Sequence, residues 1–396
     1  MEEHKGVSIM DTISSEAQAA RRRIFTAEHE LFRDQLRRFI AREIVPFHRD
    51  WERAGQVPRD LWVKAGAQGF LCTMLPEEFG GGGGDFGHAA VVIEELARVN
   101  ASGVAFQLHS DIVVPYILAY ARPEHQRAWL PKMAAGEMIG AIAMTEPGMG
   151  SDLKAIRTSA TRDGDHWVIN GAKTFISNGQ NAGLVIVVCR TDPQGGSRGL
   201  SLICVEEGTP GFTKGRNLEK IGLHAQDTSE LFFQDVRVPI THLLGAESAG
   251  FRQLMHQLPQ ERLIIAIRCA TSMETMLQQT IAYTKQREIF GQKVFDFQVH
   301  RFKLAQAKAE IAMFRVYLDD CIARHMKGEL TAEEAAAAKL LGTEMQNRLL
   351  DDFLQMHGGY GYMAEYDISR AWADARVGRI YGGSSEVMRE IIARTL

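Results

Sequence analysis

The sequence predicts an α+β protein of three domains, with a helical domain first, a β-domain in the middle and a second helical domain last. A chain of 396 residues is too long for one typical core. Apolar residues recur at helical spacing from about 26 to 136 and again after Gly250, whereas residues 138–245 hold short β-type runs. We therefore expect an N-terminal extension and three domains, at 1–25, 26–137, 138–248 and 249–396.

The first helical domain carries specific start and stop signals. Thr26 is expected to cap the first helix, since its hydroxyl can accept from an orphan backbone N–H. Pro123 suits the first position of a helix, and Gly136 suits the far end of the same helix. The run Gly80 to Gly84 resembles a phosphate loop only superficially, because no Gly-Lys-Ser/Thr follows it and no clear strand precedes it. We expect this run to be a flexible connection.

The middle domain is predicted to be an antiparallel sheet or a small barrel. Its β-type runs are 167–169, 183–190, 199–205 and 230–238. Asp163-Gly164 and Asn170-Gly171 are strong hairpin signals. Because helices do not separate the strands, a doubly wound sheet is disfavoured, and so is a nicotinamide-binding Rossmann unit.

The last domain is predicted to hold three long helices, near 251–287, 298–327 and 331–357. Thr331 and Glu334 form a capping box, in which each side chain meets an orphan backbone donor. Helices of this length with wide apolar stripes suit a bundle, and they are also suited to oligomerisation through it.

Composition excludes several classes of protein. A formal net charge of −4 gives no global field for nucleic acid or for an anionic membrane. The five cysteines form no CxxC pair, so neither a zinc site nor a disulfide framework is indicated. No apolar run approaches the ~18 residues needed to span a bilayer. The acidic first residues are followed by no secretory apolar segment, so we expect a reducing, cytoplasmic location.

Two stretches rich in small residues, 143–152 and 171–179, are predicted to be turns at which backbone approaches a flat ligand. The glycines of the first stretch have no Cβ atoms, so the main-chain groups of Met144 and Thr145 are free to reach ring heteroatoms. This chemistry points to a flavin. The alternative is an ordinary Gly/Pro turn that enters a sheet.

Glu261 is the candidate general base. If helix continues through this segment, Leu258, Ile264 and Ile265 surround the carboxylate with apolar side chains. Burial of an ionised carboxylate is costly, so desolvation would raise its pKa toward the range of a useful base. The alternative is that Pro259 opens a helix and that Glu261 only caps it.

Two further segments, 355–362 and 380–386, combine bare backbone with adjacent aromatic rings. Each is able to contact a ligand, and each is equally readable as a helix C-cap with aromatic packing. We expect His357 to be a packed histidine, because no Ser or Cys nucleophile motif accompanies it.

Together these residues resemble the acyl-CoA dehydrogenase family, and within it the long-chain type, from about Thr26 to the C-terminus. The motifs that carry the resemblance occur in the family order: Leu75 to Gly81, Met144 to Asp152, Gly171 to Gly179, Gln286-Arg287 with Phe290-Gly291, Gln355 to Gly359, and Ile380 to Glu386. The resemblance implies a helical, a β and a four-helix domain, a homotetramer, and FAD as cofactor.

The resemblance also implies the cofactor site. Met144, Thr145 and Ser151 would contact the flavin, Ser151 would also lie near the thioester, and Phe175 and Ser177 would line the isoalloxazine. Phe175 stands where many relatives carry Trp, so it keeps an apolar wall but loses an indole N–H. Arg287 would meet the FAD pyrophosphate of a neighbouring subunit. The remaining implied cofactor residues are Phe290, Gln298, Gln355, Gly358, Gly359, Ser384 and Glu386.

The catalytic base differs between members of the family. Many relatives carry it in the turn after the Ile-Tyr pair, where this chain has Gly382, whereas the long-chain and isovaleryl types carry it on a helix, at the position of Glu261. Glu261 would remove the pro-R α-proton of an acyl-CoA thioester while a hydride passes from the β-carbon to flavin N5, giving a trans-2-enoyl-CoA. The thioester oxygen would accept hydrogen bonds from the Gly382 N–H and a ribityl hydroxyl. Further implied substrate contacts are Arg262, Tyr283, Gly382 and Gly383.

The expected substrate is a medium- to long-chain or branched acyl-CoA, and the expected electron acceptor is an electron-transfer flavoprotein. A branched-chain dehydrogenase of the isovaleryl or citronellyl type is the nearest alternative. An acyl-CoA oxidase is disfavoured because typical oxidases carry extra C-terminal helices, and a non-enzymatic helical scaffold would bind no chromophore. We expect no nucleic acid partner, no bound metal and no membrane span.

Overall fold

The computed structural model describes residues 22–396, so most of the predicted extension, 1–21, lies outside the described residues. The N-terminal part is helical, as predicted. Thr26 caps the first helix by accepting from the His29 N–H, Pro123 is the first residue of the sixth helix, and Gly136, with φ of 75°, follows its end. The helices are α1 (Ala27–Glu43), α2 (His48–Ala54), α3 (Arg59–Gly66), α4 (Phe86–Arg98), α5 (Val114–Tyr120) and α6 (Pro123–Ala134), with a π-helical turn η2 (Leu108–Val113) before α5.

The glycine run after residue 79 is a tight turn, which corrects the expectation of a flexible connection. The Gly83 N–H donates to the Leu75 carbonyl and the Gly84 N–H to the Thr73 carbonyl, both over 2.9 Å. A Cβ atom on Gly81 would lie only 2.1 Å from the Leu75 oxygen. Close backbone approach therefore requires glycine at position 81.

The middle part is a seven-stranded sheet in the order β1-β4-β2-β3-β7-β6, with β5 also paired to β4. The four predicted runs are confirmed as β3, β4, β5 and β7. The sheet is largely antiparallel, but β1 runs parallel to β4, and β2 meets β4 in parallel at one pair of residues. The strands are β1 (Gly140–Ala143), β2 (Ser159–Asp163), β3 (His166–Ser177), β4 (Leu184–Arg190), β5 (Leu200–Glu206), β6 (Phe212–Asn217) and β7 (Thr228–Pro239).

One of the two predicted hairpins is wrong. Asp163-Gly164 does form the turn between β2 and β3, and Gly164 has φ of 62°. Asn170-Gly171 lies inside β3, where the pairing with β7 shifts between Ile169 and Gly171. A Cβ atom on Gly171 would lie 2.5 Å from the Thr158 hydroxyl oxygen, so this glycine allows a bulge and a close approach.

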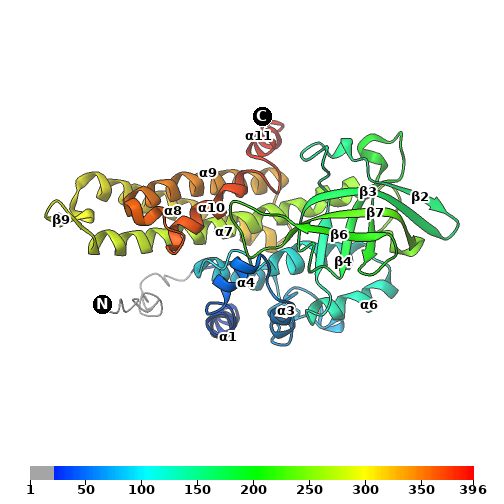
Figure 1. Cartoon of the computed structure of the whole chain (residues 1–396), viewed down its shortest axis with the longest axis horizontal. Coiled ribbons are helices and arrows are strands. Elements are labelled where there is room, and N and C mark those ends of the chain that lie inside the picture. Colours follow the sequence, from blue (N-terminus) through cyan, green and yellow to red (C-terminus); the bar gives the residue numbers. More distant parts are fainter. Residues whose placement is uncertain (1–21) are drawn as a thin grey trace.

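The C-terminal part is a long helical bundle, which Figure 1 shows extending away from the sheet. The three predicted long helices are confirmed, and the capping box of Thr331 and Glu334 is present. A small two-stranded hairpin, β8 (Glu288–Ile289) and β9 (Gln292–Lys293), lies at the far end of the bundle (Figure 1). The helices are α7 (Gly250–Gln286), α8 (Gln298–Met326), α9 (Ala332–His357), α10 (Asp367–Ala375) and α11 (Ser385–Ala393).

Buried apolar side chains join these parts. Strand β4 is buried on both faces: Leu184 and Ile186 pack with the N-terminal helices, whereas Val185 and Val187 pack inside the sheet. Helix α4 packs against α7 and α8, so the first helical part covers the base of the bundle. Among the described residues, every helix is too short or too polar to cross a membrane.

Candidate active site

Glu261 lies in the middle of an unbroken helix. Helix α7 begins at Gly250 and continues through Pro259, so the alternative in which Pro259 opens a helix and Glu261 caps it is wrong. The side chain of Glu261 is buried, with 6% of its surface exposed. The apolar residues Leu263 and Ile264 beside it belong to the bundle core. The carboxylate is therefore held in a low-dielectric environment.

Residues 22–396 provide the Glu261 side chain with one hydrogen bond. The Tyr116 hydroxyl, from α5, donates to Glu261 Oε1 over 3.0 Å. Burial raises the pKa of Glu261 to about 7, against the opposing effects of the Tyr116 hydrogen bond and the positive charge of Arg262. A carboxylate with a pKa in this range is suited to accept a proton near neutral pH.

Arg262 follows Glu261 and is also buried, with 5% of its surface exposed. Among the described residues the Arg262 side chain has no hydrogen-bond or ion-pair partner, and its Nε is a buried donor without an acceptor. Burial lowers the pKa of this guanidinium, and the charge of Glu261 opposes that effect. A buried guanidinium without a partner points to an acceptor group on a ligand.

Gly382 and Gly383 lie against the helix that carries Glu261. A Cβ atom on Gly382 would be 2.5 Å from the Ile265 Cδ1, one helical turn after Glu261, and the φ of Gly382 is 61°. The Lys339 ammonium donates to the Gly383 carbonyl over 2.6 Å. At Gly382 bare backbone with positive φ therefore lies against Ile265, one helical turn beyond Glu261.

The stretch around Met144 is anchored by a buried ion pair. The Lys173 ammonium lies 2.9 Å from Glu146 Oε1 and also donates to the Met144 carbonyl over 3.0 Å. Glu146 further accepts from the backbone N–H groups of Arg157 and Thr158. The carboxylate of Glu146 is therefore a structural anchor for this loop.

The rest of this loop is open to a ligand. The Thr145 carbonyl accepts from the Thr174 N–H over 2.9 Å, so the carbonyl of Thr145 is engaged within the protein, as is that of Met144. Cβ atoms on Gly148 and Gly150 would meet nothing within 4 Å, and Ser151 is exposed. The loop thus offers a bare surface with fixed backbone.

Phe175 stands out from β3 on strained backbone. Its φ is 60° and its side chain is 67% exposed, within a bulge of the β3–β7 pairing. Ser177 pairs with Thr228 across the same ladder. Residues 171–177 are therefore strand, which corrects the predicted turn; the turn follows at Asn178, with φ of 60°. An exposed aromatic ring on strained backbone is a candidate ligand wall.

A second group of predicted cofactor residues lies at the far end of the bundle. Arg287 is 26 residues beyond Glu261, about 39 Å along a helical axis. Its guanidinium stacks over the Tyr360 ring at 5.6 Å, and Phe290 is 94% exposed with φ of 48°. The exposed residues Gln298, Gln355, Gly358 and Gly359 belong to the same end of the bundle.

Tyr283, predicted to contact substrate, also lies in this far group. Its hydroxyl donates to the His357 carbonyl over 3.1 Å and its ring stacks on His357 at 4.2 Å, so His357 is a packed histidine as expected. Within one chain the structure does not bring Tyr283 or Arg287 beside Glu261. The segment 355–362 is a helix C-cap, with Gly358 at φ of 59°.

The segment 380–386 ends one helix and begins another. Ile380 is the C-cap of the 3-10 helix η8 (Arg376–Arg379), so the alternative of a C-cap holds for the start of this segment. Ser384 caps α11 by accepting from the Val387 N–H over 3.4 Å, and Glu386 lies exposed in the first turn.

Two residues of the site were not singled out from the sequence. Tyr116 is 145 residues away from the Glu261 that it contacts, and nothing in its local pattern marks it. Lys173 is a charged residue within a β-type run. A lysine buried in a strand needs an ion-pair partner, and this was the signal in the sequence. Only the fold shows that this partner is Glu146.

Comparison with known proteins gives consistent matches. Family models described as acyl-CoA dehydrogenase N-terminal, middle and C-terminal domains match residues 26–137, 141–236 and 248–396. The chain is 50% identical over 377 residues to a mitochondrial long-chain specific acyl-CoA dehydrogenase of Sus scrofa, covering 95% of this chain and 88% of that one. It is 32% identical over 372 residues to an isovaleryl-CoA dehydrogenase of Pongo abelii, covering 93% and 88%. A crystal structure of an acyl-CoA dehydrogenase from Geobacillus kaustophilus aligns with a TM-score of 0.92 and 50% identity, covering 94% and 98%.

Proposed function

The chain belongs to the acyl-CoA dehydrogenase family, and on this premise we propose that Glu261 is the base that removes the α-proton of an acyl-CoA thioester. The protein is an oxidoreductase that introduces a double bond between the α- and β-carbons of the acyl group. The observation that carries the assignment is the burial of Glu261 on an unbroken helix, together with Gly382, which lies against Ile265 of the same helix and offers no alternative carboxylate.

The residues around Glu261 fit proton removal from a weak carbon acid. A thioester α-carbon becomes acidic when its carbonyl oxygen accepts hydrogen bonds, and we assign one of these to the Gly382 N–H. Arg262, a buried guanidinium without a protein partner, is assigned to an acceptor group of the substrate. Gly383, held by Lys339, fixes the turn that presents this backbone.

The chain offers a surface that fits FAD. The loop of Met144, Thr145 and Ser151 has fixed backbone with open space at its glycines, and Phe175 and Ser177 stand on the adjoining strand. Ser384 and Glu386, at the start of α11, complete the predicted set for this group. FAD supplies, when bound, the acceptor at N5 for the hydride that leaves the β-carbon.

The far group of Arg287, Phe290, Gln298, Gln355, Gly358 and Gly359 is assigned to the FAD of a neighbouring subunit. Arg287 and Phe290 are exposed, and Arg287 is about 39 Å from Glu261 along α7, so one chain cannot offer both residues to one catalytic centre. A guanidinium suits a pyrophosphate. A homotetramer is therefore part of the proposal.

Identity of 50% to a long-chain relative, against 32% to an isovaleryl relative, supports a medium- to long-chain acyl-CoA over a short branched one. We assign the reduced cofactor's electrons to an electron-transfer flavoprotein. The five cysteines are buried free thiols, which fits the predicted reducing, cytoplasmic compartment.

The proposed function is tested with purified protein and a panel of acyl-CoAs. We expect a yellow protein whose flavin absorbance is bleached anaerobically by saturated acyl-CoAs, with kcat/KM highest for unbranched medium or long chains. A protein that remains colourless after incubation with FAD would refute the assignment. A preference for branched chains would favour the isovaleryl or citronellyl type.

A further inference from the structure

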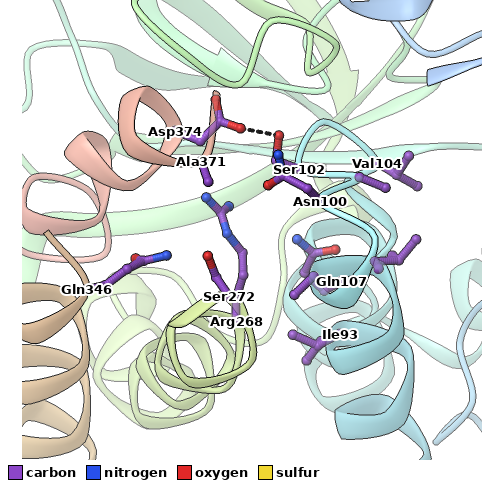
Figure 2. A pocket seen from close by; sticks show the side chains of 13 residues that line it. Ile93, Asn100, Ser102, Val104, Gln107, Arg268, Ser272, Gln346, Ala371 and Asp374 are labelled. Carbon is purple, nitrogen blue, oxygen red and sulfur yellow. Dashed lines mark hydrogen bonds between the residues drawn. The ribbon is translucent and has the colours of Figure 1, made fainter. Parts of the chain in front are cut away.

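A second polar site surrounds Arg268, between α4, α7, α9 and α10 (Figure 2). Apart from Arg268, the lining residues from these elements and from the loop after α4 are half polar and half apolar. The polar ones are Asn100, Ser102, Gln107, Ser272, Gln346 and Asp374. The open volume is about 20 Å³, enough for one or two water-sized groups.

Arg268 has no hydrogen-bond partner among the described residues, although it offers five N–H donors. Figure 2 shows its side chain directed into the cavity, with Gln107 and Gln346 approaching from either side. The amide oxygen of Gln107 is likewise buried without a partner. A buried amide oxygen without a partner is costly in a folded protein, and the Arg268 nitrogens face the open volume, where an acceptor group of a ligand can reach them.

The charges around the cavity limit what that ligand is. Burial opposes the charge on Arg268, but the neighbouring Tyr381 and Asp374 outweigh it and raise the pKa of the guanidinium above its ordinary value. Asp374 accepts from the Ser102 hydroxyl and from the Leu223 N–H. The positive charge of Arg268 and the negative charge of Asp374 therefore balance. An uncharged oxygen of a ligand fits this cavity better than a second carboxylate would.

The cavity lies along the face of α7 that carries Glu261. Arg268 follows Glu261 by seven residues, which returns it to the same side of the helix about 10 Å further on. Tyr116 contacts Glu261, and Gln107, nine residues earlier, lines the cavity with Arg268. The segment from Gln107 to Tyr116 thus runs beside α7 in the opposite direction, between the cavity and Glu261.

We infer that Arg268 is a specificity-determining residue that receives a hydroxyl oxygen carried on the acyl chain, roughly eight carbons beyond the α-carbon. This inference rests on the proposed function and names a substrate class for the same site, the hydroxylated acyl-CoAs. A hydroxyl oxygen can accept a hydrogen bond from Arg268, and its O–H can at the same time donate a hydrogen bond to a neighbouring amide oxygen or to Asp374.

The test compares kcat/KM for octanoyl-, decanoyl- and dodecanoyl-CoA with their ω-hydroxy counterparts, using the wild-type holoenzyme. We expect the ω-hydroxyl to raise kcat/KM about tenfold at one chain length, near decanoyl, and to have less effect at the other two lengths. Within each variant the ratio of kcat/KM for the ω-hydroxy chain to kcat/KM for the plain chain is compared: Arg268→Met should abolish the gain, and Arg268→Lys should retain part of it. The matched control is Arg38→Met, an exposed arginine on α1, which should keep the wild-type pattern.

Three results would overturn the inference. They are an equal kcat/KM for plain and ω-hydroxy chains at every length, a gain that survives in Arg268→Met, and a preference for ω-carboxy over ω-hydroxy chains. The first needs no variant, so poor folding of a variant leaves the test intact. Absence of flavin bleaching by any acyl-CoA would refute the proposed function instead, which separates the two failures.

Discussion

The hydroxyl of Tyr116 donates a hydrogen bond of 3.0 Å to Oε1 of Glu261, and this bond joins the N-terminal helices to the long helix of the C-terminal bundle. The two residues are buried and belong to different parts of the chain. The basicity of Glu261 is therefore set by the packing of α5 against α7 as well as by its own helix.

Removal of this bond should shift the pH profile. The Tyr116 hydroxyl stabilises the ionised carboxylate, so Tyr116→Phe should raise the pKa of Glu261 above its value of about 7. We expect the acid limb of kcat/KM to move up by about one pH unit. Tyr120→Phe is the matched control, since Tyr120 bonds to His256 and not to Glu261. An unchanged acid limb in Tyr116→Phe would contradict this assignment.

The raised pKa of Glu261 also predicts how stability depends on pH. The carboxyl is neutral in folded and unfolded chains below its ordinary pKa of 4.5, and its ionisation destabilises the folded state increasingly up to about pH 7. Glu261→Gln has no carboxyl to ionise and so avoids this destabilisation. The difference in unfolding free energy between the variant and the wild type should therefore be larger at pH 8 than at pH 5, by about 2 kcal/mol in favour of the variant.

Calorimetric Tm values of wild type and Glu261→Gln at the two pH values measure this difference. Glu365→Gln, at an exposed position, serves as the control and should show no such dependence. A Tm gain for Glu261→Gln that is the same at both pH values would show that the carboxyl is not desolvated.

The sequence predicted Glu261 as a candidate but left its setting open. Apolar neighbours at helical spacing indicated burial, yet Pro259 was an equally good helix start. The structure resolves this because α7 begins at Gly250, nine residues before the proline, and packing against α4 and α9 outweighs the lost backbone bond. Tertiary context of this kind is absent from a local pattern.

The buried ion pair of Lys173 and Glu146 should control cofactor binding. Lys173→Met leaves Glu146 with two backbone donors but no counter-charge, and it removes the bond to the Met144 carbonyl. We expect the Kd for FAD to rise at least tenfold while the far-ultraviolet circular dichroism is kept. Lys132→Met, at an exposed position on α6, should bind FAD normally. Wild-type FAD affinity in Lys173→Met would show that the loop does not depend on this pair.

The separation of Arg287 from Glu261 predicts complementation between subunits. Glu261→Gln and Arg287→Ala chains should each be inactive alone, because each lacks one half of every catalytic centre. Mixed oligomers contain centres with both residues intact, so equal coexpression should restore about a quarter of the wild-type activity. The measurement is acyl-CoA turnover per purified chain. Mixed oligomers that remain inactive would show that one chain supplies both residues.

The middle domain shows where local signals are ambiguous. The four predicted strands form because β-branched runs such as residues 184–190 are buried on both faces of β4. Asn170-Gly171 has the same chemistry as a hairpin turn, but its glycine serves a bulge against Thr158. Pairing partners decide between these two outcomes: Asn170 pairs with Ser159 of β2, eleven residues earlier, and Gly171 pairs with Phe233 of β7, sixty-two residues later.

The partners of single side chains were the least predictable part of the site. The contact of Tyr116 with Glu261 depends on the angle between two helices, and the unpaired guanidinium of Arg268 depends on four elements that meet around it. No periodic pattern in the sequence predicts which of these side chains come into contact. The sequence identified Glu261 as a candidate base and residues 143–152 as a candidate flavin loop, and the fold showed which side chains contact them.

Anaerobic mixing of Glu261→Gln holoprotein with saturated acyl-CoA tests directly whether Glu261 is the base. We predict that this variant keeps its FAD and a wild-type flavin spectrum, and that acyl-CoA fails to bleach the flavin. Bleaching of the flavin in Glu261→Gln at the wild-type rate would show that Glu261 is not the base.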